Sequence, residues 1–343
     1  MNSEEKFDLI KRNTQEIVGE KELKEILSKR DLKVYIGSET SGRPHIGYFV
    51  WMMKVADLLN SGAEVKILLA DLHAHLNDMK SPFELLAKRA EFYSEVFKAA
   101  LRSAGADVSK LKFIKGTDFQ LKKDFCLDVF RMASMATLHD CNKATSDVVR
   151  QSDNPKLGGT IYPILQSLDE QYLDVDMQLA GNDQRKIQMF AREYLPKLGY
   201  KARIEMMMPL VPGLAEGGKM SSSVEHSKID FLDEEAVIKK KLNKAFCPEG
   251  QIEGNGVLAF AKAVVMQRKH DKGEKFVIER PEKWGGNLEY TTYEALEKDF
   301  SEKKLHPGDL KQAVASEINK MLEPIREAMK GKEDLIKEAY PQE

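Results

Sequence analysis

Apolar residues follow two alternating spacings over the first two thirds of the chain. Residues 33–37 (KVYIG) form a short apolar run that predicts a buried strand. Apolar positions then recur at helical spacing between residues 46 and 61, and residues 65–71 (VKILLAD) predict a second strand. A strand, a helix and a strand in this order are typical of a parallel sheet with right-handed crossovers.

The same alternation continues toward residue 225. Further strands are expected at residues 111–116, 175–181 and 203–209. Helices are expected at residues 82–104, 123–139, 159–173 and 183–195. This order predicts an α/β domain built on a doubly wound, Rossmann-like parallel sheet, and we place that domain within residues 1–230.

The pattern becomes helical and charged after about residue 230. Helices are expected at residues 234–246, 256–266, 292–300 and 307–329. Thr291 and Glu294 have the spacing of a capping box, and Pro307 suits the first turn of the last long helix. We therefore expect a smaller, all-helical domain at residues 231–330, followed by a frayed charged tail at residues 331–343.

Composition narrows the class of protein. The length of 343 residues favours two domains, and a content of 42% apolar and 31% charged residues is ordinary for a globular protein. The formal net charge of −2 argues against binding nucleic acid by bulk positive charge, so any RNA contact needs a clustered face. The amino terminus lacks a signal-type apolar segment and no stretch suits a membrane span, so a cytoplasmic protein is expected. The three cysteines have no CxxC spacing, and we expect reduced packing residues: Cys126, Cys141 and Cys247.

A first candidate signature, His45-Ile46-Gly47, follows the first predicted strand. A helix that begins at His45 would present free backbone N–H groups to a phosphate beyond the strand end. His45 could donate a hydrogen bond to that phosphate, and Gly47 would let a base or ribose approach the backbone. A histidine after a proline is more often a surface or cap residue, and only its place at the strand-to-helix switch favours a ligand site.

A second candidate signature, Lys219-Met220-Ser221-Ser222-Ser223, follows paired glycines. The backbone, the Lys219 ammonium and the hydroxyls of Ser221 and Ser222 could close over a polyphosphate. The competing interpretation is a solvated Gly/Ser linker.

Together, and in this order, the two signatures resemble the HIGH and KMSKS motifs of class I aminoacyl-tRNA synthetases. The segments between them resemble the tyrosyl-tRNA synthetases of the archaeal and eukaryotic type. These segments are YIG at 35–37, ADLHAH at 70–75, IYPILQ at 161–166, LD at 168–169 and DQRK at 183–186. The likeness extends from about residue 5 to 329. Tyr48 departs from it by replacing the second histidine of HIGH, and Ser222 by replacing the second lysine of KMSKS.

The resemblance implies a tyrosine–tRNA ligase. Such an enzyme activates L-tyrosine with ATP and Mg²⁺ to tyrosyl-adenylate and pyrophosphate, and then transfers the tyrosyl group to the 3′-terminal adenosine of tRNA(Tyr). It implies catalytic roles for His45, Lys219, Ser221 and Ser222. It implies ATP contacts at Gly37, His45, Gly47, Lys219 and Ser222, no resident metal site, no membrane partner, and a homodimer.

A candidate amino-acid pocket lies on one predicted helix. Tyr162, Gln166 and Asp169 are spaced by four and three residues, which places them on one helix face. Such a polar stripe is usually only the solvated side of a helix. The resemblance implies instead that Tyr162 and Gln166, with Gln184, bind the α-ammonium group of tyrosine. It implies that Tyr35 and Asp169 bind the phenolic hydroxyl.

The carboxyl-terminal region offers three candidates for RNA contact. Trp284 could stack on an unpaired base, and His306 and Asp309 lie at a helix start where they could recognise a base edge. The resemblance implies that they bind the first anticodon base, whereas the competing interpretation of Trp284 is a packing anchor. His73 and His75 have a spacing that can bind metal at a strand end, but the sequence supplies no further ligands and we reject that site. The resemblance implies instead that this segment lines the floor of the amino-acid pocket.

Two other functions stay open at this point. A tryptophanyl-tRNA synthetase shares the architecture, and Tyr35 with Asp169 disfavours it because an indole has no hydroxyl group. A non-catalytic RNA-binding or signalling relative would keep the fold, but the intact set of candidate side chains disfavours it.

Overall fold

The computed structural model describes residues 1–149, 154, 156–217 and 228–341. Its central feature is a six-stranded sheet in the order β1-β6-β5-β2-β3-β4. The strands expected from the sequence are confirmed, and all five are parallel: β2 (Lys33–Ser38), β3 (Glu64–Leu69), β4 (Leu111–Lys115), β5 (Met177–Gly181) and β6 (Ile204–Met208). The strand order reverses between β2 and β5, as in doubly wound folds.

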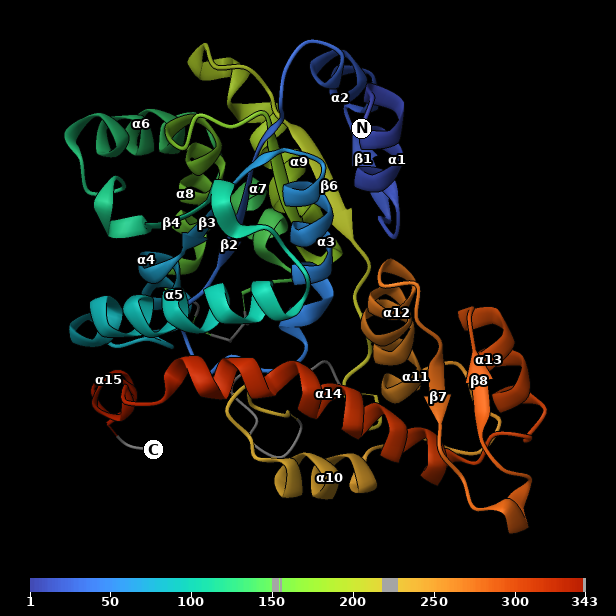
Figure 1. The fold of residues 1–343 in the computed structure, drawn as a ribbon. Helices are drawn as coiled ribbons and strands as arrows, with labels where there is room; N and C mark the ends of the chain where they lie inside the picture. The colour runs from blue at the N-terminus through green and yellow to red at the C-terminus, as the bar shows by residue number, and fades with distance from the viewer. Residues whose placement is uncertain (150–153, 155, 218–227, 342–343) are drawn as a thin grey trace.

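Helices cover both faces of this sheet (Figure 1). One face packs against α3 (Tyr48–Asn60) and α5 (Leu86–Ser103), and the other packs against helices of the middle of the chain. These helices are α6 (Lys123–Ala133), α7 (Leu138–Thr145), α8 (Gly158–Tyr172) and α9 (Arg185–Tyr194). Because side chains alternate along a strand, Val34 and Ile36 join the core beneath α3 and α5, whereas Tyr35 joins the core beneath α8.

The amino-terminal segment adds elements that the sequence analysis did not predict. The helices α1 (Ser3–Lys11) and α2 (Glu20–Leu27) flank the edge strand β1 (Glu16–Val18), which pairs antiparallel with β6. The helix expected at 123–139 is divided into α6 and α7, because Thr137 caps the second helix by accepting the Asp140 backbone N–H at 3.1 Å.

The short helix α4 (Asp71–Leu76) follows β3 directly. The placement of His73 and His75 at the end of a strand is therefore wrong, since both lie on this helix. His73 is buried, and His75 Nδ1 lies 3.0 Å from the backbone oxygen of Ser81.

The carboxyl-terminal region is mainly helical. Its expected helices correspond to α10 (Glu235–Lys244), α11 (Gly256–Phe260), α13 (Tyr293–Ser301) and α14 (Pro307–Met329), which starts at Pro307 as expected. A π-helical segment, Ala261–Met266, joins α11 to α12 (Gln267–Asp271). The capping residue of α13 is Thr292, which accepts the Ala295 N–H, so the expected capping box at Thr291 and Glu294 is wrong by one position.

Two expectations for this region need amendment. It contains an antiparallel pair of strands, β7 (Phe276–Ile278) and β8 (Leu288–Tyr290), and so is not purely helical. The expected frayed tail instead includes α15 (Glu333–Ala339), which lies against the end of α5 in Figure 1. Apolar side chains from both halves of the chain join in one buried cluster. Within the described ranges, no helix is long and apolar enough to cross a membrane.

Candidate active site

A cavity of about 430 Å³ opens at the carboxyl ends of β2 and β5, where the strand order reverses. Its walls come from β2, α3, α8, the segment after β5 and the segment after β6. The predicted site residues that line it are Tyr35, Gly37, His45, Gly47, Tyr162, Gln166, Asp169 and Gln184. The predicted site residues on and just after β2 and those on α8 thus line the same cavity.

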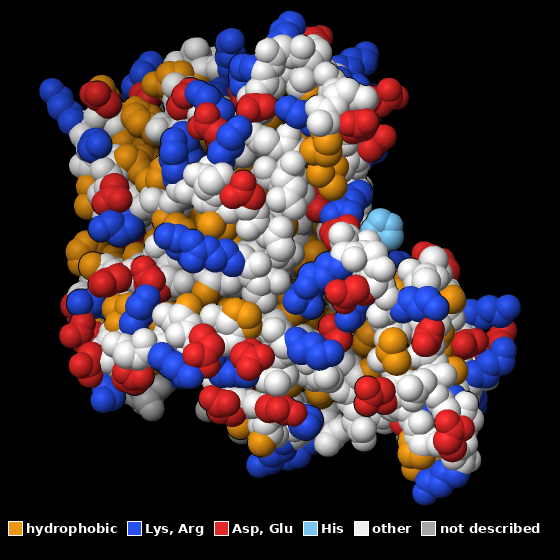
Figure 2. Space-filling view, viewed as in Figure 1, with side chains coloured by type: hydrophobic (Ala, Val, Ile, Leu, Met, Phe, Trp, Pro, Cys, Tyr) orange, Lys and Arg blue, Asp and Glu red, His pale blue; other side chains and the backbone are white. Residues whose placement is uncertain are grey.

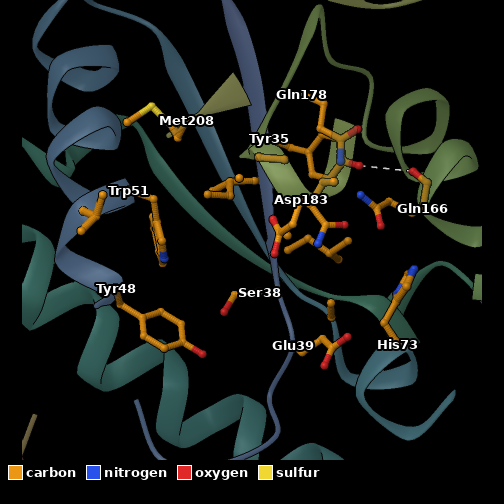
Figure 3. A pocket seen from close by; sticks show the side chains of 18 of the residues that line it. Tyr35, Ser38, Glu39, Tyr48, Trp51, His73, Gln166, Gln178, Asp183 and Met208 are labelled. Atoms are coloured by element: carbon orange, nitrogen blue, oxygen red, sulfur yellow. Dashed lines mark hydrogen bonds between the residues drawn. The ribbon is translucent and has the colours of Figure 1, made fainter. Parts of the chain in front are cut away.

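The deep end of the cavity holds Tyr35 and Asp169, both fully buried. The Tyr35 hydroxyl donates to the backbone oxygen of Gln166 at 3.2 Å, the dashed line in Figure 3. Asp169 Oδ1 accepts the Gln120 amide at 2.6 Å, whereas Oδ2 has no hydrogen-bond partner among the described residues. Burial raises the pKa of Asp169 well above its ordinary value, against the opposing effect of the Gln120 hydrogen bond.

His73 lies beside this pair, as the resemblance of its segment implies. Its Nε2 lies 3.7 Å from Asp169 Oδ2, and its ring packs edge-on against Tyr162 with centroids 4.7 Å apart. Burial lowers the pKa of His73 to about 4, so its ring is neutral near pH 7. His73 therefore forms a neutral part of the pocket wall.

A second polar group of side chains lies at the mouth of the cavity. The Tyr162 hydroxyl donates to Glu39 Oε1 at 2.9 Å, and the Asn77 amide donates to the same oxygen at 2.8 Å. Since the Tyr162 proton is directed at Glu39, the Tyr162 oxygen is left to accept a hydrogen bond. Gln184 Oε1 is buried without a partner in the part of the chain that the structure describes. These acceptors and the Glu39 carboxylate suit a cationic group; Glu39 and Asn77 were not predicted.

His45 does not begin a helix. It forms an antiparallel bridge with Asp230, and the Ile46 N–H donates to the Ile229 oxygen at 2.9 Å. This pairing keeps residues 45 and 46 out of the helix, and α3 starts only at Tyr48 with Gly47 as its capping residue. The expectation of a helix beginning at His45 is therefore wrong by three residues.

The protonation state of His45 follows from its contacts. Its Nδ1 accepts the Gly47 backbone N–H at 3.2 Å, which assigns the ring proton to Nε2. Burial, together with the charge of Lys228, lowers the pKa of His45 to about 3. His45 is accordingly a neutral hydrogen-bond donor near pH 7 rather than a cation.

Gly37 and Tyr48 shape the same part of the cavity. A Cβ added at Gly37 would meet no atom of the described residues within 4 Å, so its small size leaves space for a ligand rather than for packing. The Tyr48 side chain reaches toward Ser38 in Figure 3, and its ring packs against the rings of His45 and Phe97, with centroids 4.9 and 5.4 Å away. Burial raises the pKa of Tyr48. The residue at this departure from the family motif is thus held in place by neighbouring rings.

The second signature cannot be placed in this geometry. Lys219, Ser221 and Ser222 lie outside the described residues. The described segment that leads toward them lines the cavity through Met208, Pro209, Leu210 and Val211.

The candidate anticodon residues lie far along the chain from this cavity. Trp284 ends a 3-10 turn (Glu282–Trp284) and its side chain is 59% exposed, which argues against a packing anchor. His306 caps α14 by accepting the Gly308 N–H at 3.0 Å, and Asp309 follows in the first turn. The Arg280 guanidinium, which donates to the backbone oxygens of Gly286 and Lys304, ties the two segments together.

Large apolar side chains are exposed on and around α6. Phe130, the most exposed of them at 70%, lies near Leu121, Leu127 and Leu138 in the sequence. Figure 2 shows hydrophobic side chains on the left edge of the molecule, where Figure 1 places α6. Exposed apolar patches of this kind mark sites of protein association.

Cysteines and metal-binding groups add no further chemistry. Cys141 and Cys247 are buried, Cys126 is half-buried, and all three are free thiols. Among the described residues, no group of three or more His, Cys, Asp or Glu side chains could hold a metal ion.

Comparison with known proteins adds independent information. Residues 27–323 match the family described as tRNA synthetases class I (W and Y). The cytoplasmic tyrosine–tRNA ligase of Gallus gallus is 55% identical over 340 residues, which cover 98% of this chain and 64% of that protein. The tyrosine–tRNA ligase of Haloarcula marismortui is 44% identical over 342 residues, which cover 100% of this chain and 99% of that protein.

A solved structure resembles the whole fold. The tyrosyl-tRNA synthetase of Archaeoglobus fulgidus, complexed with L-tyrosine, has a TM-score of 0.87 and 40% identity to this chain. The match covers 96% of this chain and 100% of that chain.

Proposed function

The chain belongs to the class I tRNA synthetases of the tryptophan and tyrosine group, in its tyrosine–tRNA ligase branch, and from this we propose that it is itself a tyrosine–tRNA ligase. It would activate L-tyrosine with ATP to tyrosyl-adenylate and then transfer the tyrosyl group to the 3′-terminal adenosine of tRNA(Tyr). The observation that carries the proposal is the buried pair of Tyr35 and Asp169 at the closed end of the cavity.

Tyr35 and Asp169 would select the phenolic hydroxyl of tyrosine. The phenol O–H can donate to Asp169 Oδ2, and its oxygen can accept from Tyr35 once that hydroxyl turns from Gln166. A hydrogen bond to the charged carboxylate would offset the burial that now raises the pKa of Asp169. An amino acid whose ring carries no hydrogen-bonding group would leave Asp169 Oδ2 buried without a partner, which costs free energy.

The α-ammonium group would bind at the cavity mouth. Tyr162, Gln166 and Gln184 offer neutral oxygen acceptors for its three N–H donors, and Glu39 supplies the opposite charge behind Tyr162. This arrangement would direct the substrate carboxylate toward Gly37 and His45.

ATP would occupy the part of the cavity near Gly37, His45 and Gly47. A carboxylate oxygen of tyrosine attacks the α-phosphorus, and the bond to the pyrophosphate oxygen breaks, so that no protein nucleophile is required. The neutral His45 donates its Nε2–H to the α-phosphate as negative charge builds there. We propose that Lys219, Ser221 and Ser222 supply charge and hydrogen bonds to the leaving pyrophosphate.

Mg²⁺ would arrive with the nucleotide. This ion keeps several waters and binds mainly through substrate phosphates, which fits a site whose described residues offer no carboxylate cluster of their own.

The tRNA contacts would extend over the carboxyl-terminal half. We propose residues 1–230 as the catalytic domain, residues 231–330 as the anticodon-binding domain and residues 331–343 as a charged tail. Trp284 is exposed enough to stack on the first anticodon base, and His306 and Asp309 could hydrogen-bond to its edge. A second copy of the chain would cover the apolar surface around Phe130 and give a homodimer. Relatives named cytoplasmic support the same location for this protein.

The two alternatives are disfavoured by the same cavity. The indole N–H of tryptophan could donate to Asp169 Oδ2, but indole has no hydroxyl oxygen to accept from Tyr35, so tryptophan is the poorer substrate. A non-catalytic relative would have no physical reason to keep a neutral His45 in the same cavity as three buried acceptors, Asp169 Oδ2, Gln178 Oε1 and Gln184 Oε1, that have no partner among the described residues.

Pyrophosphate exchange tests the proposal directly. The purified protein should exchange labelled pyrophosphate into ATP when tyrosine is present and not when tryptophan replaces it. The opposite preference would reject the assignment, and absence of exchange with either amino acid would favour the non-catalytic alternative.

A further inference from the structure

The turn that carries His45 is held from two sides. On one side, its backbone pairs with the segment around Asp230, as described above. On the other side, two side chains of α5 hydrogen-bond to consecutive backbone oxygens of the turn. Arg89 Nη1 donates to the Ser41 oxygen at 2.7 Å, and the Tyr93 hydroxyl donates to the Gly42 oxygen. Backbone carbonyls fixed in this way leave the turn little freedom to shift.

Arg89 reaches a second loop at the same time. Its Nη1 also lies 3.1 Å from the Lys80 backbone oxygen and 3.2 Å from Ser81 Oγ. This loop follows α4, whose Asn77 cap donates to Glu39 at the cavity mouth. One guanidinium therefore links the turn that leads to His45 in the cavity wall to the loop that follows α4.

The third contact of Arg89 comes from the carboxyl-terminal segment. Its Nε donates to the Ala339 backbone oxygen at 3.1 Å, and the guanidinium lies 4.8 Å from the centre of the Tyr340 ring. Tyr340 is only 5% exposed and packs edge-on against Phe92, with ring centroids 5.5 Å apart. Figure 1 shows α15, whose last residue is Ala339, beside α5.

We propose that Arg89 and Tyr340 are positioning residues for the nucleotide end of the cavity. Tyr340 and the Ala339 oxygen hold the planar guanidinium in one orientation, and the guanidinium holds the turn that leads to His45. Arginine suits this task because its donors form a rigid fork and its face stacks on an aromatic ring. The inference deepens the proposed function and rests on it, because the turn would place His45 against the α-phosphate of ATP.

Loss of Arg89 should impair ATP use more than tyrosine binding. A displacement of about 1 Å in a catalytic group can cost about 100-fold in rate, so Arg89→Met should lower kcat/KM for ATP by about 10- to 100-fold. The dissociation constant for tyrosine should change by less than about threefold, because its proposed contacts lie mainly on β2 and α8. Arg89→Lys, which keeps the charge but loses the fork, should fall between the wild type and Arg89→Met.

Tyr340→Ala should reproduce part of the same defect, about 3- to 10-fold in kcat/KM for ATP, consistent with a cation–π contact. The double variant Arg89→Met/Tyr340→Ala should be no worse than Arg89→Met alone, because Tyr340 acts through Arg89. Lys88→Gln is the matched control. It removes an exposed ion pair of α5 with Glu338 of α15, at 2.6 Å, and should leave exchange unchanged.

Hydrogen exchange separates this inference from the proposed function. Amides of residues 38–47 should exchange faster in Arg89→Met and Tyr340→Ala than in the wild type or Lys88→Gln, whatever the enzyme activates. If these amides keep wild-type rates, the inference is wrong, even when tyrosine-dependent exchange proves the proposed function. If the two single-variant losses multiply fully in the double variant, Tyr340 does not act through Arg89. If the wild type fails to exchange pyrophosphate with tyrosine, the proposed function is wrong, and the amide rates still decide whether Arg89 and Tyr340 hold the turn.

Discussion

The neutral state of His45 makes a quantitative prediction about stability and pH. Folding lowers the pKa of His45 from an ordinary value of 6.5 to about 3, chiefly because the ring is buried. Between these two pH values the unfolded chain binds a proton that the folded chain does not. The contribution of His45 to stability is therefore complete above pH 6.5 and is lost as the pH falls toward 3.

The size of this effect follows from proton linkage. At pH 5.0 the unfolded histidine is almost fully protonated, about 1.5 pH units below its pKa, whereas the folded ring stays neutral. Lowering the pH from 7.5 to 5.0 should thus remove about 2 kcal/mol of stability through His45 alone. His45→Gln cannot take up this proton, so the variant lacks that pH dependence.

Urea unfolding of the wild type and of His45→Gln at both pH values provides the assay. The difference between their unfolding free energies should move by about 2 kcal/mol in favour of the variant as the pH falls to 5.0. Taking the difference cancels other titrating groups that the two proteins share. A difference that stays constant within about 0.5 kcal/mol would refute the buried, neutral state of His45 and the donor role that depends on it.

Three further predictions concern other parts of the molecule. Glu39→Gln should raise KM for tyrosine about tenfold, because a charge-assisted contact behind Tyr162 is worth about 1.5 kcal/mol. Binding of 4-hydroxyphenyllactate, which lacks the ammonium group, should change much less. An equal loss of affinity for both ligands would contradict the role of Glu39. Gly256→Ala should lower the unfolding free energy by about 1–3 kcal/mol, because the added Cβ would lie 2.0 Å from the backbone oxygen of Gly213. Gly37→Ala is the control for stability, because a Cβ there meets no atom of the described residues within 4 Å. Equal stability of the two variants would contradict this reasoning. Trp284→Ala should leave pyrophosphate exchange and stability unchanged. It should lower kcat/KM for tRNA in the charging reaction, because a stacking contact worth about 1–3 kcal/mol is lost. Unchanged kcat/KM for tRNA would show that Trp284 does not contact the RNA.

The parallel strands β2, β3, β5 and β6 were predictable because most of their residues are buried and their sequences are mainly apolar. The edge strand β4 is only partly buried, and its apolar residues Leu111, Phe113 and Ile114 marked it. The short edge strand β1 gave no extended apolar run, since its three residues are only partly buried. β7 and β8 are equally short, with three residues each, and they pair with each other, so they too give no extended apolar run. Helix α4 was missed because it follows β3 without a turn, and its first apolar residues extend the strand pattern.

The cavity residues divide in a similar way. Tyr162, Gln166 and Asp169 were found because motif resemblance and helical spacing both mark them, whereas Tyr35 and the segment of His73 were marked by resemblance alone. Glu39 was missed as a pocket residue because its role depends on contacts between segments that are distant along the chain. The start of α3 was misplaced because the pairing of residues 45 and 46 with the segment at 229–230 is a tertiary effect that local sequence does not encode.

The central claim is that Tyr35 and Asp169 bind the hydroxyl group of a tyrosine substrate through hydrogen bonds. Amino-acid binding, measured by calorimetry with tyrosine and phenylalanine on the wild type and on Asp169→Ala, tests it most directly. The account predicts strong binding of tyrosine and weak binding of phenylalanine by the wild type, with the preference for tyrosine largely lost in the variant. Equal binding of the two amino acids by the wild type, or an undiminished preference in Asp169→Ala, would contradict it.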